Sequence, residues 1–276
     1  MTAPLARCPR EQLAAVRVLF TDLDDTLTSG GKLGPEALAA LGRAAERGLP
    51  VFIVTGGPAG AAETLARLLP VAGAVGESGA IWFWRDGADG AGGAMRVGRA
   101  LGEAELEEAR ARRARVLARI RAEVPAARAA HDQSLRDVDL AIELAPDGRP
   151  LPAADVARVE AISAEEGLRT GRSSIHVNAW PPRYDKITGA RAVLHAALGQ
   201  ELDALVPAGA AAYVGDALND AGAFAYFPFS VGVANVAPLL EQLPVPPAWM
   251  TRAGFGAGFA ELVEALLAST PADPRR

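Results

Sequence analysis

The chain has 276 residues, 50% of them hydrophobic, and a formal net charge of −5. A chain of this length can bury a substantial core and normally forms one large or two moderate domains, of which two fit better here. The charge gives no general attraction to nucleic acid or to anionic membranes, so we expect neither as a partner. Residues 1–17 contain no apolar run typical of a signal peptide, and no other run approaches a membrane span in length, so we expect a cytoplasmic protein.

A predicted strand at residues 16–23 ends in two carboxylates. Its apolar run is followed by Asp22 and Asp24, which are two positions apart. Alternate residues of a strand point to the same side, so both side chains could face the crevice at the carboxyl end of the strand, where open α/β sheets bind ligands. The alternative for an isolated Asp-x-Asp is an acidic loop that caps the next helix.

Helices and strands then alternate along the chain. The predicted elements are helices at residues 35–47 and 59–68 and strands at residues 50–55 and 73–75. This alternation predicts an α/β fold with a doubly wound, parallel, Rossmann-like sheet. The second strand ends in Thr55, Gly56 and Gly57, a hydroxyl followed by two glycines whose backbone N–H groups could approach an anion closely.

The pattern changes between residues 84 and 181, where we predict an inserted α+β cap domain. Its predicted elements are helices at residues 103–123 and 153–166 and strands at residues 138–144 and 174–179. The glycine-rich stretch at residues 86–93 precedes them and predicts a hairpin or a linker. Arginines are numerous in the first of these helices, but acidic residues precede them, and a solvated helix face explains them better than a nucleic-acid site does.

The chain returns to the predicted core with Lys186, which begins a helix that ends at Leu198. An ammonium group at the start of a helix is unfavourable to the helix dipole unless an anion lies nearby, although an isolated lysine is more often a solvated surface residue. A further strand at residues 211–215 then leads into Asp216, and Asp220 follows four residues later. The ends of two strands therefore both offer carboxylates.

Four carboxylates around one crevice repel each other unless a cation neutralises them. Oxygen ligands favour a hard cation, and Mg²⁺ typically takes one or two carboxylates together with waters and phosphate oxygens. Zinc is disfavoured because the chain has one cysteine and its three histidines show no ligand spacing. The expected Mg²⁺ ligands come from Asp22, Asp24, Asp216 and Asp220.

In this order, the segments resemble the four motifs of the haloacid dehalogenase superfamily of phosphohydrolases. Asp22-Leu23-Asp24-Asp25-Thr26 resembles the first motif, Thr55 the second, Lys186 the third and Gly215-Asp216-Ala217-Leu218-Asn219-Asp220 the fourth. The position of the insert is similar to that of the subgroup with a large α/β cap, type IIB, which includes many sugar phosphatases. Gly57 is a departure, because an arginine often follows the Thr-Gly pair in that subgroup. Any contact from that arginine must come from elsewhere.

The resemblance implies a phosphatase that acts on a small phosphorylated metabolite, in particular a sugar phosphate, through an aspartyl-phosphate. Asp22 would be the nucleophile, and Asp24 would protonate the leaving oxygen and then activate water. Asp216 would be a further metal ligand, and Asn219 and Asp220 would bind the metal ion or orient its waters. Thr55 and Lys186 would hydrogen-bond the transferring oxygens, and the Gly56-Gly57 pair would contact the substrate. The implied domains are a core of residues 1–83 and 182–276 and a cap of residues 84–181.

The cap is expected to select the substrate, and its candidate residues lie near its end. In a strand, Arg172, Ser174, His176 and Asn178 would share one face, a polar strip that could bind sugar hydroxyls. The alternative is a sheet surface that faces solvent. Arg136 is a second candidate, since it resembles a position in related sugar phosphatases.

Three alternatives remain open or are disfavoured. A sugar phosphomutase also uses an aspartyl-phosphate, and nothing in the motifs separates it from a phosphatase. A dehalogenase is disfavoured because displacement of a halide needs neither a general acid such as Asp24 nor a divalent metal bound by Asp216. A non-catalytic protein that binds a phosphometabolite is disfavoured because it would have no need to retain both Asp22 and Asp24.

Overall fold

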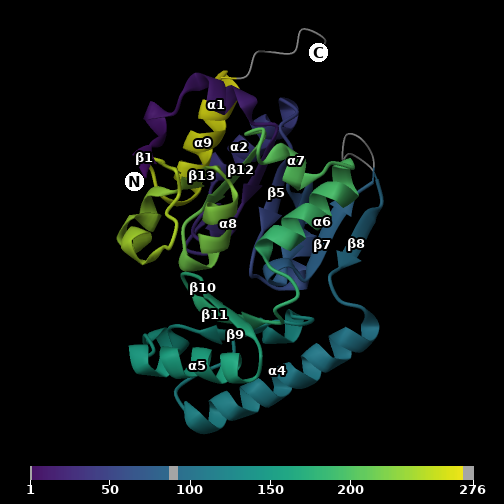
Figure 1. Ribbon diagram of the computed structural model, residues 1–276, viewed down its shortest axis with the longest axis vertical. Helices are drawn as coiled ribbons and strands as arrows, with labels where there is room; N and C mark the ends of the chain where they lie inside the picture. The colour runs from purple at the N-terminus through teal and green to yellow at the C-terminus, as the bar shows by residue number, and fades with distance from the viewer. Residues whose placement is uncertain (1, 87–92, 270–276) are drawn as a thin grey trace.

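The computed structural model describes residues 2–86 and 93–269. A large α/β unit and a smaller unit lie one above the other, and two segments of chain join them (Figure 1). The larger unit contains a nine-stranded sheet, and the smaller contains a three-stranded sheet. The predicted α/β class with an inserted cap is therefore confirmed. Most of the glycine-rich stretch predicted at residues 86–93 lies outside the described residues.

The large sheet has the strand order β1-β14-β13-β12-β2-β5-β6-β7-β8. Neighbouring strands from β1 to β6 are parallel, and β7 and β8 continue the sheet in antiparallel pairs. The bounds of the strands are β1 Ala3–Pro4, β2 Val18–Thr21, β5 Val51–Val54, β6 Gly73–Gly76, β7 Ile81–Arg85, β8 Met95–Arg99, β12 Ala211–Gly215, β13 Phe229–Gly232 and β14 Trp249–Met250.

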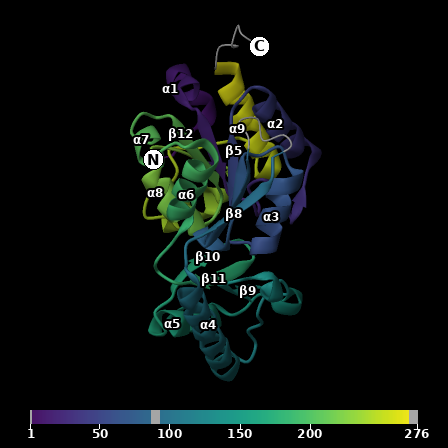
Figure 2. The same cartoon turned by 90° about the vertical axis from the view of Figure 1, so that its right-hand side faces the viewer.

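Helices cover both faces of this sheet (Figure 2). One face packs against α1 Arg10–Ala15, α2 Pro35–Glu46, α3 Ala59–Leu68 and α9 Phe255–Ser269, and the other against α6 Lys186–Leu198, α7 Leu202–Leu205 and α8 Ala221–Tyr226. Because both faces are covered, the central strands read as continuous apolar runs. Leu19 of β2 joins the first of these cores, and Phe20 joins the second, where its ring stacks on Phe52 at a centroid distance of 5.4 Å.

The smaller unit is built from an antiparallel sheet of order β10-β11-β9 with two helices on one of its faces. Figures 1 and 2 show the sheet between these helices and the large unit. Val177 and Ala179 of the middle strand pack toward the helices. The alternate residues of that strand therefore face the large unit. The bounds of these elements are α4 Glu103–Glu123, β9 Leu140–Glu143, α5 Ala153–Glu165, β10 Arg169–Arg172 and β11 His176–Trp180.

The remaining elements are short. A two-stranded ribbon joins β3 Thr28–Ser29 to β4 Lys32–Leu33, and the 3-10 helices are η1 Leu5–Arg7, η2 Glu77–Gly79, η3 Gln133–Leu135, η4 Pro146–Gly148, η5 Leu218–Asp220 and η6 Ala234–Gln242.

The predicted helices agree with the structure to within one residue at each end. The predicted cap boundary at residue 84 differs, because it falls inside β7. The strand β8 pairs with β7 from Ile81↔Arg99 to Arg85↔Met95 and so extends the large sheet. The predicted insert includes β8 because the partner of an edge strand cannot be read from the sequence of that strand. We propose that the cap begins after Arg99, and we retain the proposed return to the core at residue 182.

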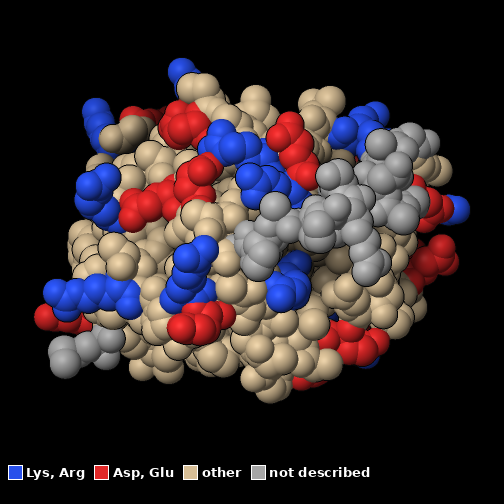
Figure 3. Space-filling model, turned by 90° about the horizontal axis from the view of Figure 1, so that it is seen from above, with Lys and Arg blue, Asp and Glu red and all other residues tan. Residues whose placement is uncertain are grey.

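The surface of the larger unit at the end remote from the cap carries basic and acidic side chains side by side, with no broad field of one sign (Figure 3). No helix in the described part of the chain combines the length and the apolar character that a membrane crossing requires.

Candidate active site

The carboxyl ends of three neighbouring parallel strands carry the predicted site residues. Asp22 follows β2, Thr55 follows β5, and Asp216 follows β12. In the register of the sheet, Thr21 lies between Val214 and Ile53. Residues at the ends of adjacent parallel strands therefore emerge at one edge of the sheet. The structure brings together the segments that the sequence pattern singled out.

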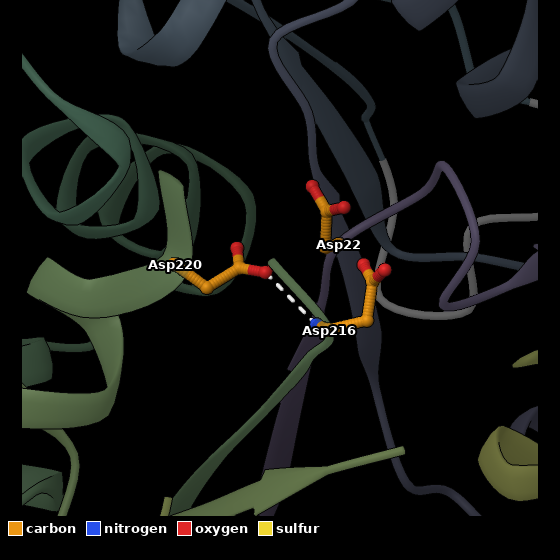
Figure 4. Close-up of side chains that lie close together, drawn as sticks. All are labelled: Asp22, Asp216 and Asp220. Carbon is orange, nitrogen blue, oxygen red and sulfur yellow. Dashed lines mark hydrogen bonds between the residues drawn. The ribbon is translucent and has the colours of Figure 1, made fainter. Parts of the chain in front are cut away.

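Three carboxylates form a buried cluster at this edge (Figure 4). One oxygen each from Asp22, Asp216 and Asp220 lies within 4.8 Å of the others. Their exposed fractions are only 3%, 4% and 0%. A cluster of oxygen ligands with so little access to water is suited to a hard divalent cation, which would offset the repulsion between the carboxylates.

Lys186 is the first residue of α6, and its ammonium group lies inside this cluster. Asp185 caps the helix by accepting a hydrogen bond from the Thr188 N–H at 2.9 Å. The Nζ atom of Lys186 donates to Asp22 Oδ1 and to Asp220 Oδ1, each at 2.6 Å. Burial opposes its charge, but the two carboxylates outweigh burial and raise the pKa of Lys186 above its ordinary value. The lysine is therefore a charged, buried group and not a solvated surface residue.

Asp220 is bound on both of its oxygens. Its Oδ1 also accepts a hydrogen bond from the Tyr213 hydroxyl at 2.6 Å. Its Oδ2 accepts the backbone N–H groups of Asp216 at 3.0 Å, drawn in Figure 4, and of Ala217 at 3.1 Å. Asp220 therefore holds the Lys186 ammonium and the turn after β12, and little of its hydrogen-bonding capacity remains for a metal ion.

The other two carboxylates of the cluster are costly to ionise. Burial, partly offset by the Lys186 charge, raises the pKa of Asp22 to about 7. Burial and the neighbouring charges of Asp22 and Asp220 raise the pKa of Asp216 to about 8. Both oxygens of Asp216 are oriented, since Oδ1 accepts from the Thr26 hydroxyl at 2.9 Å and Oδ2 from the Asn235 amide at 3.0 Å.

Asp24 lies apart from this cluster and faces a pocket. Its carboxylate makes no hydrogen bond to any residue that the structure describes, so it is free to contact a ligand. Burial raises the pKa of Asp24 above its ordinary value, and attraction to Lys186 only partly offsets that effect. A carboxyl group with a raised pKa is suited to donate a proton near neutral pH.

The pocket has a volume of about 330 Å³ and lies between the two units. The larger unit provides Asp22, Asp24, Asn219 and the loop Thr55-Gly56-Gly57. The smaller unit provides His131, Asp132, Arg136, Ser173, His176 and Asn178. The pocket therefore joins the carboxylate edge of the large sheet to the polar face of the small one.

Arg136 reaches from the cap to the loop after β5. Its Nη1 donates to the Gly56 carbonyl oxygen at 2.6 Å, and its Nε and Nη2 donate to the two oxygens of Asp132 at 3.1 Å each. The guanidinium thus lies beside Gly56, next to Gly57, the position at which the related subgroup often has an arginine. Gly56 also packs closely against the cap, because a Cβ atom there would lie 2.2 Å from Asn178 Nδ2 and would displace that side chain.

The comparison with known proteins rests on structure, since no family model and no curated protein matches the sequence. Sucrose-phosphatase from Synechocystis, solved with sucrose and phosphate, is 15% identical, with 90% of this chain and 97% of that chain covered and a TM-score of 0.62. The C-terminal domain of trehalose-6-phosphate phosphatase from C. albicans is 14% identical, with 98% and 100% covered and a TM-score of 0.65. A sugar phosphatase of haloacid dehalogenase subclass IIB is 14% identical, with 90% and 98% covered and a TM-score of 0.58. The chain has the haloacid dehalogenase fold.

Within this fold, the predicted polar strip of the cap is only half correct. A turn at residues 173–175 separates β10 from β11, so Arg172 lies on the other strand and pairs with Val177. Residues paired across a sheet share a face, so Arg172 points toward the helices, where it binds Glu160 of α5 at 2.6 and 2.5 Å. Ser174 is exposed in the turn and does not line the pocket. A short turn without glycine or proline was not evident in the alternating pattern.

His176 and Asn178 line the pocket, and their contact with a sugar stays a prediction. Burial, assisted by the Arg136 charge, lowers the pKa of His176 to about 4, so its imidazole is neutral at physiological pH. The Oδ1 atom of Asn178 is buried and has no hydrogen-bond partner among the described residues. A buried polar atom without a partner is unusual in a folded protein and is consistent with a contact that a ligand would complete.

Sequence reasoning missed several residues that shape the site. Asp132 holds Arg136, and Asn235 and Thr26 orient Asp216. Asp139 is fully buried beside Glu77, and burial followed by the Glu77 charge raises the pKa of Asp139 well above its ordinary value. Thr26 lies within the first motif, but its partner Asp216 is distant in the sequence, and Asp132, Asn235 and Asp139 lie in none of the four motifs.

Proposed function

We propose that this protein is a Mg²⁺-dependent phosphatase that hydrolyses a small phosphorylated metabolite, in particular a sugar phosphate, through an aspartyl-phosphate on Asp22. The observation that carries the proposal is the buried arrangement at one sheet edge, where Asp22 contacts Lys186 and lies beside Asp216. Asp24 and Thr55 line the adjoining pocket together with Asp22. Asp22 thus belongs both to the buried carboxylate cluster and to the pocket, which supports roles for these groups as nucleophile, acid, anion-binding groups and cation site.

The residues fit a divalent metal ion. Asp22 and Asp216 offer buried oxygens whose pKa values are raised to about 7 and about 8, so a positive charge beside them would be strongly favourable. We propose Asp22 and Asp216 as the direct ligands. Asn219 and Asp24 line the adjoining pocket, where they would orient the water ligands of the metal ion. When bound, Mg²⁺ would shield the carboxylate from the phosphate charge and neutralise charge on the transferring oxygens.

The proposed reaction has two displacements. The free oxygen of Asp22 attacks phosphorus, the bond from phosphorus to the ester oxygen breaks, and Asp24 gives its proton to that oxygen. Asp24, now ionised, takes a proton from water, which attacks the phosphorus and releases phosphate and the Asp22 carboxylate. The Lys186 ammonium and the Thr55 hydroxyl would stabilise the charge on the transferring oxygens throughout.

The cap wall of the pocket supports a hydroxyl-rich leaving group. Neutral His176, the amide of Asn178 and the hydroxyl of Ser173 offer hydrogen bonds without net charge. The charge of Arg136 is already balanced by Asp132. The similar solved structures include proteins named sucrose-phosphatase and trehalose-6-phosphate phosphatase, which also supports a sugar phosphate.

The test is a panel of phosphorylated sugars assayed for phosphate release with Mg²⁺ and with a chelator. We expect release from at least one sugar phosphate, loss of release with the chelator, and recovery when Mg²⁺ is restored. A phosphomutase would transfer the phosphoryl group between sugar positions without net release, and a binding protein would do neither. Either result would replace the proposed hydrolysis.

A further inference from the structure

The turn Glu77–Gly79 is hydrogen-bonded to the loop that carries Thr55. The Glu77 N–H donates to the Gly57 carbonyl at 2.8 Å, and the Ser78 N–H donates to the Thr55 carbonyl at 3.1 Å. Glu77 and Ser78 adopt left-handed φ values of 49° and 58° although neither is glycine, and both are buried. Two consecutive residues in this conformation persist only where the surrounding structure holds them, and such strain clusters at functional sites.

The Glu77 carboxylate is fully buried and joins the two units. Its Oε1 accepts the backbone N–H groups of Ala59 at 3.2 Å and of Asp137 at 2.7 Å. Its Oε2 accepts those of Val138 at 2.7 Å and of Asp139 at 2.9 Å. Three of these four donors are consecutive residues of the cap, and hydrogen bonds to an ionised acceptor are stronger than neutral ones. No step of the proposed reaction uses this carboxylate.

The cap segment of residues 131–139, called here the cap loop, is therefore fixed to the core just after Arg136. Arg136 itself is held at its side chain by the Gly56 carbonyl and at its own carbonyl by Arg113 Nη1 at 2.9 Å. The same turn also touches the segment that returns from the cap. A Cβ atom on Gly79, whose φ is +118°, would lie 2.1 Å from the Asp185 carbonyl oxygen, next to Lys186.

We propose that Glu77 is a positioning residue that fixes the cap loop over the pocket and thereby sets selectivity for the leaving group. The proposal rests on the proposed phosphatase function. Because Glu77 contacts backbone and not the pocket, it acts through the placement of Asp132 and Arg136, whose side chains line the cap wall. Of the core residues proposed to act on the phosphate, Asp22 and Lys186 are held by contacts with each other and with Asp220, and not by this carboxylate.

The test compares Glu77→Gln with the matched variant Asp137→Asn. An amide offers one acceptor oxygen and places an NH₂ group against the cap N–H donors, so the cap loop should loosen. In the control, the Asp137 side chain loses only surface ion pairs to Arg99 and Arg110, while its N–H still reaches Glu77. The two measurements are kcat/KM for the preferred sugar phosphate against p-nitrophenyl phosphate, and amide hydrogen exchange at residues 137–139.

For Glu77→Gln, we expect kcat/KM for the sugar phosphate to fall by about 10- to 100-fold, the scale for losing hydrogen bonds to a charged group. The aryl ester should change by less than about threefold, since it makes few cap contacts. Exchange at residues 137–139 should accelerate. Glu77→Asp keeps the charge on a shorter side chain and should recover part of the selectivity, and it carries the same comparison if the glutamine variant does not fold.

Equal losses for both substrates would show that Glu77 acts through the fold as a whole and would overturn the proposal. Unchanged selectivity with unchanged exchange would also overturn it. If neither wild type nor Asp137→Asn releases phosphate from any ester, the proposed function fails separately. In that case the exchange measurement alone decides, and unaltered exchange in Glu77→Gln shows that this carboxylate does not position the cap loop.

Discussion

Replacing Asp22 with asparagine should abolish phosphatase activity and leave the fold intact. The amide is a poor nucleophile and a weaker cation ligand than the carboxylate. The two side chains are nearly the same size, and the position is only 3% exposed, so packing around it is preserved. Lys186 keeps its second ion pair to Asp220 at 2.6 Å.

The same substitution should change how stability depends on pH. Burial, only partly offset by Lys186, raises the pKa of Asp22 from 3.8 to about 7. The folded protein therefore keeps a proton that the unfolded chain releases, and the free energy of unfolding of the metal-free protein falls as the pH rises from about 4 to about 7. At about 1.4 kcal/mol per pKa unit, ionised Asp22 costs up to about 4 kcal/mol. Asparagine does not titrate and avoids this cost.

The assay is urea unfolding of wild type and Asp22→Asn in a chelating buffer across mildly acidic to mildly alkaline pH. We expect the free energies of unfolding to be most similar near pH 4, where Asp22 is protonated in the folded protein and only partly ionised in the unfolded chain, and the variant to become the more stable protein as the pH rises to about 7. Added Mg²⁺ should reduce the pH dependence of wild type more than that of the variant, because it binds the ionised carboxylate. Phosphate release from p-nitrophenyl phosphate is measured on the same samples.

Two results would refute this reasoning. A variant that hydrolyses the ester at the wild-type rate, with contaminating phosphatase excluded, would remove Asp22 as the nucleophile. A variant whose stability falls with pH as steeply as that of wild type would show that ionising Asp22 is not costly in the folded protein. The first result concerns the chemistry, and the second concerns the electrostatics of the buried cluster.

Three further predictions test the acid, the anion-binding group and the cap. Asp24→Asn should slow phosphorylation of the enzyme by an ordinary sugar phosphate more than by p-nitrophenyl phosphate, because the leaving group of the aryl ester needs less protonation. Equal losses in the single-turnover rates of the two substrates would remove the general-acid role. Lys186→Ala should lower kcat by roughly 10²- to 10³-fold, the scale for losing one preorganised hydrogen-bond donor. The control Lys32→Ala, at an exposed position, should leave kcat unchanged. Unchanged kinetics in Lys186→Ala would contradict the anion-binding role of this buried lysine. Asn178→Ala should lower kcat/KM for the preferred sugar phosphate by roughly 5- to 150-fold more than kcat/KM for p-nitrophenyl phosphate. Arg172→Ala is the matched cap control. If the two variants change the ratio of sugar phosphate to aryl ester activity equally, Asn178 does not recognise the sugar.

The sequence by itself determined the α/β class, the helices of both units and the convergence of the strand ends. Covered parallel strands leave continuous apolar runs, as in β2 and β5, and residues just after such runs must emerge at one edge of the sheet. The emergence of Asp22, Thr55 and Asp216 at one edge therefore follows from the sequence pattern, and the strand order β12-β2-β5 then makes them neighbours. Local pattern suffices where geometry follows from the period of a strand or a helix.

Only the tertiary structure decided how the side chains of the site are shared between roles. The contacts of Asp220 with Lys186 and with the turn after β12, and those of Glu77 with the cap loop, depend on how separate segments pack, and no local period encodes them. The turn before β11 likewise reversed the expected direction of Arg172, because it pairs Arg172 with Val177, whose face of the sheet packs against the helices. Burial, which raises the pKa values of Asp22 and Asp24, likewise depends on tertiary packing and on no local sequence pattern.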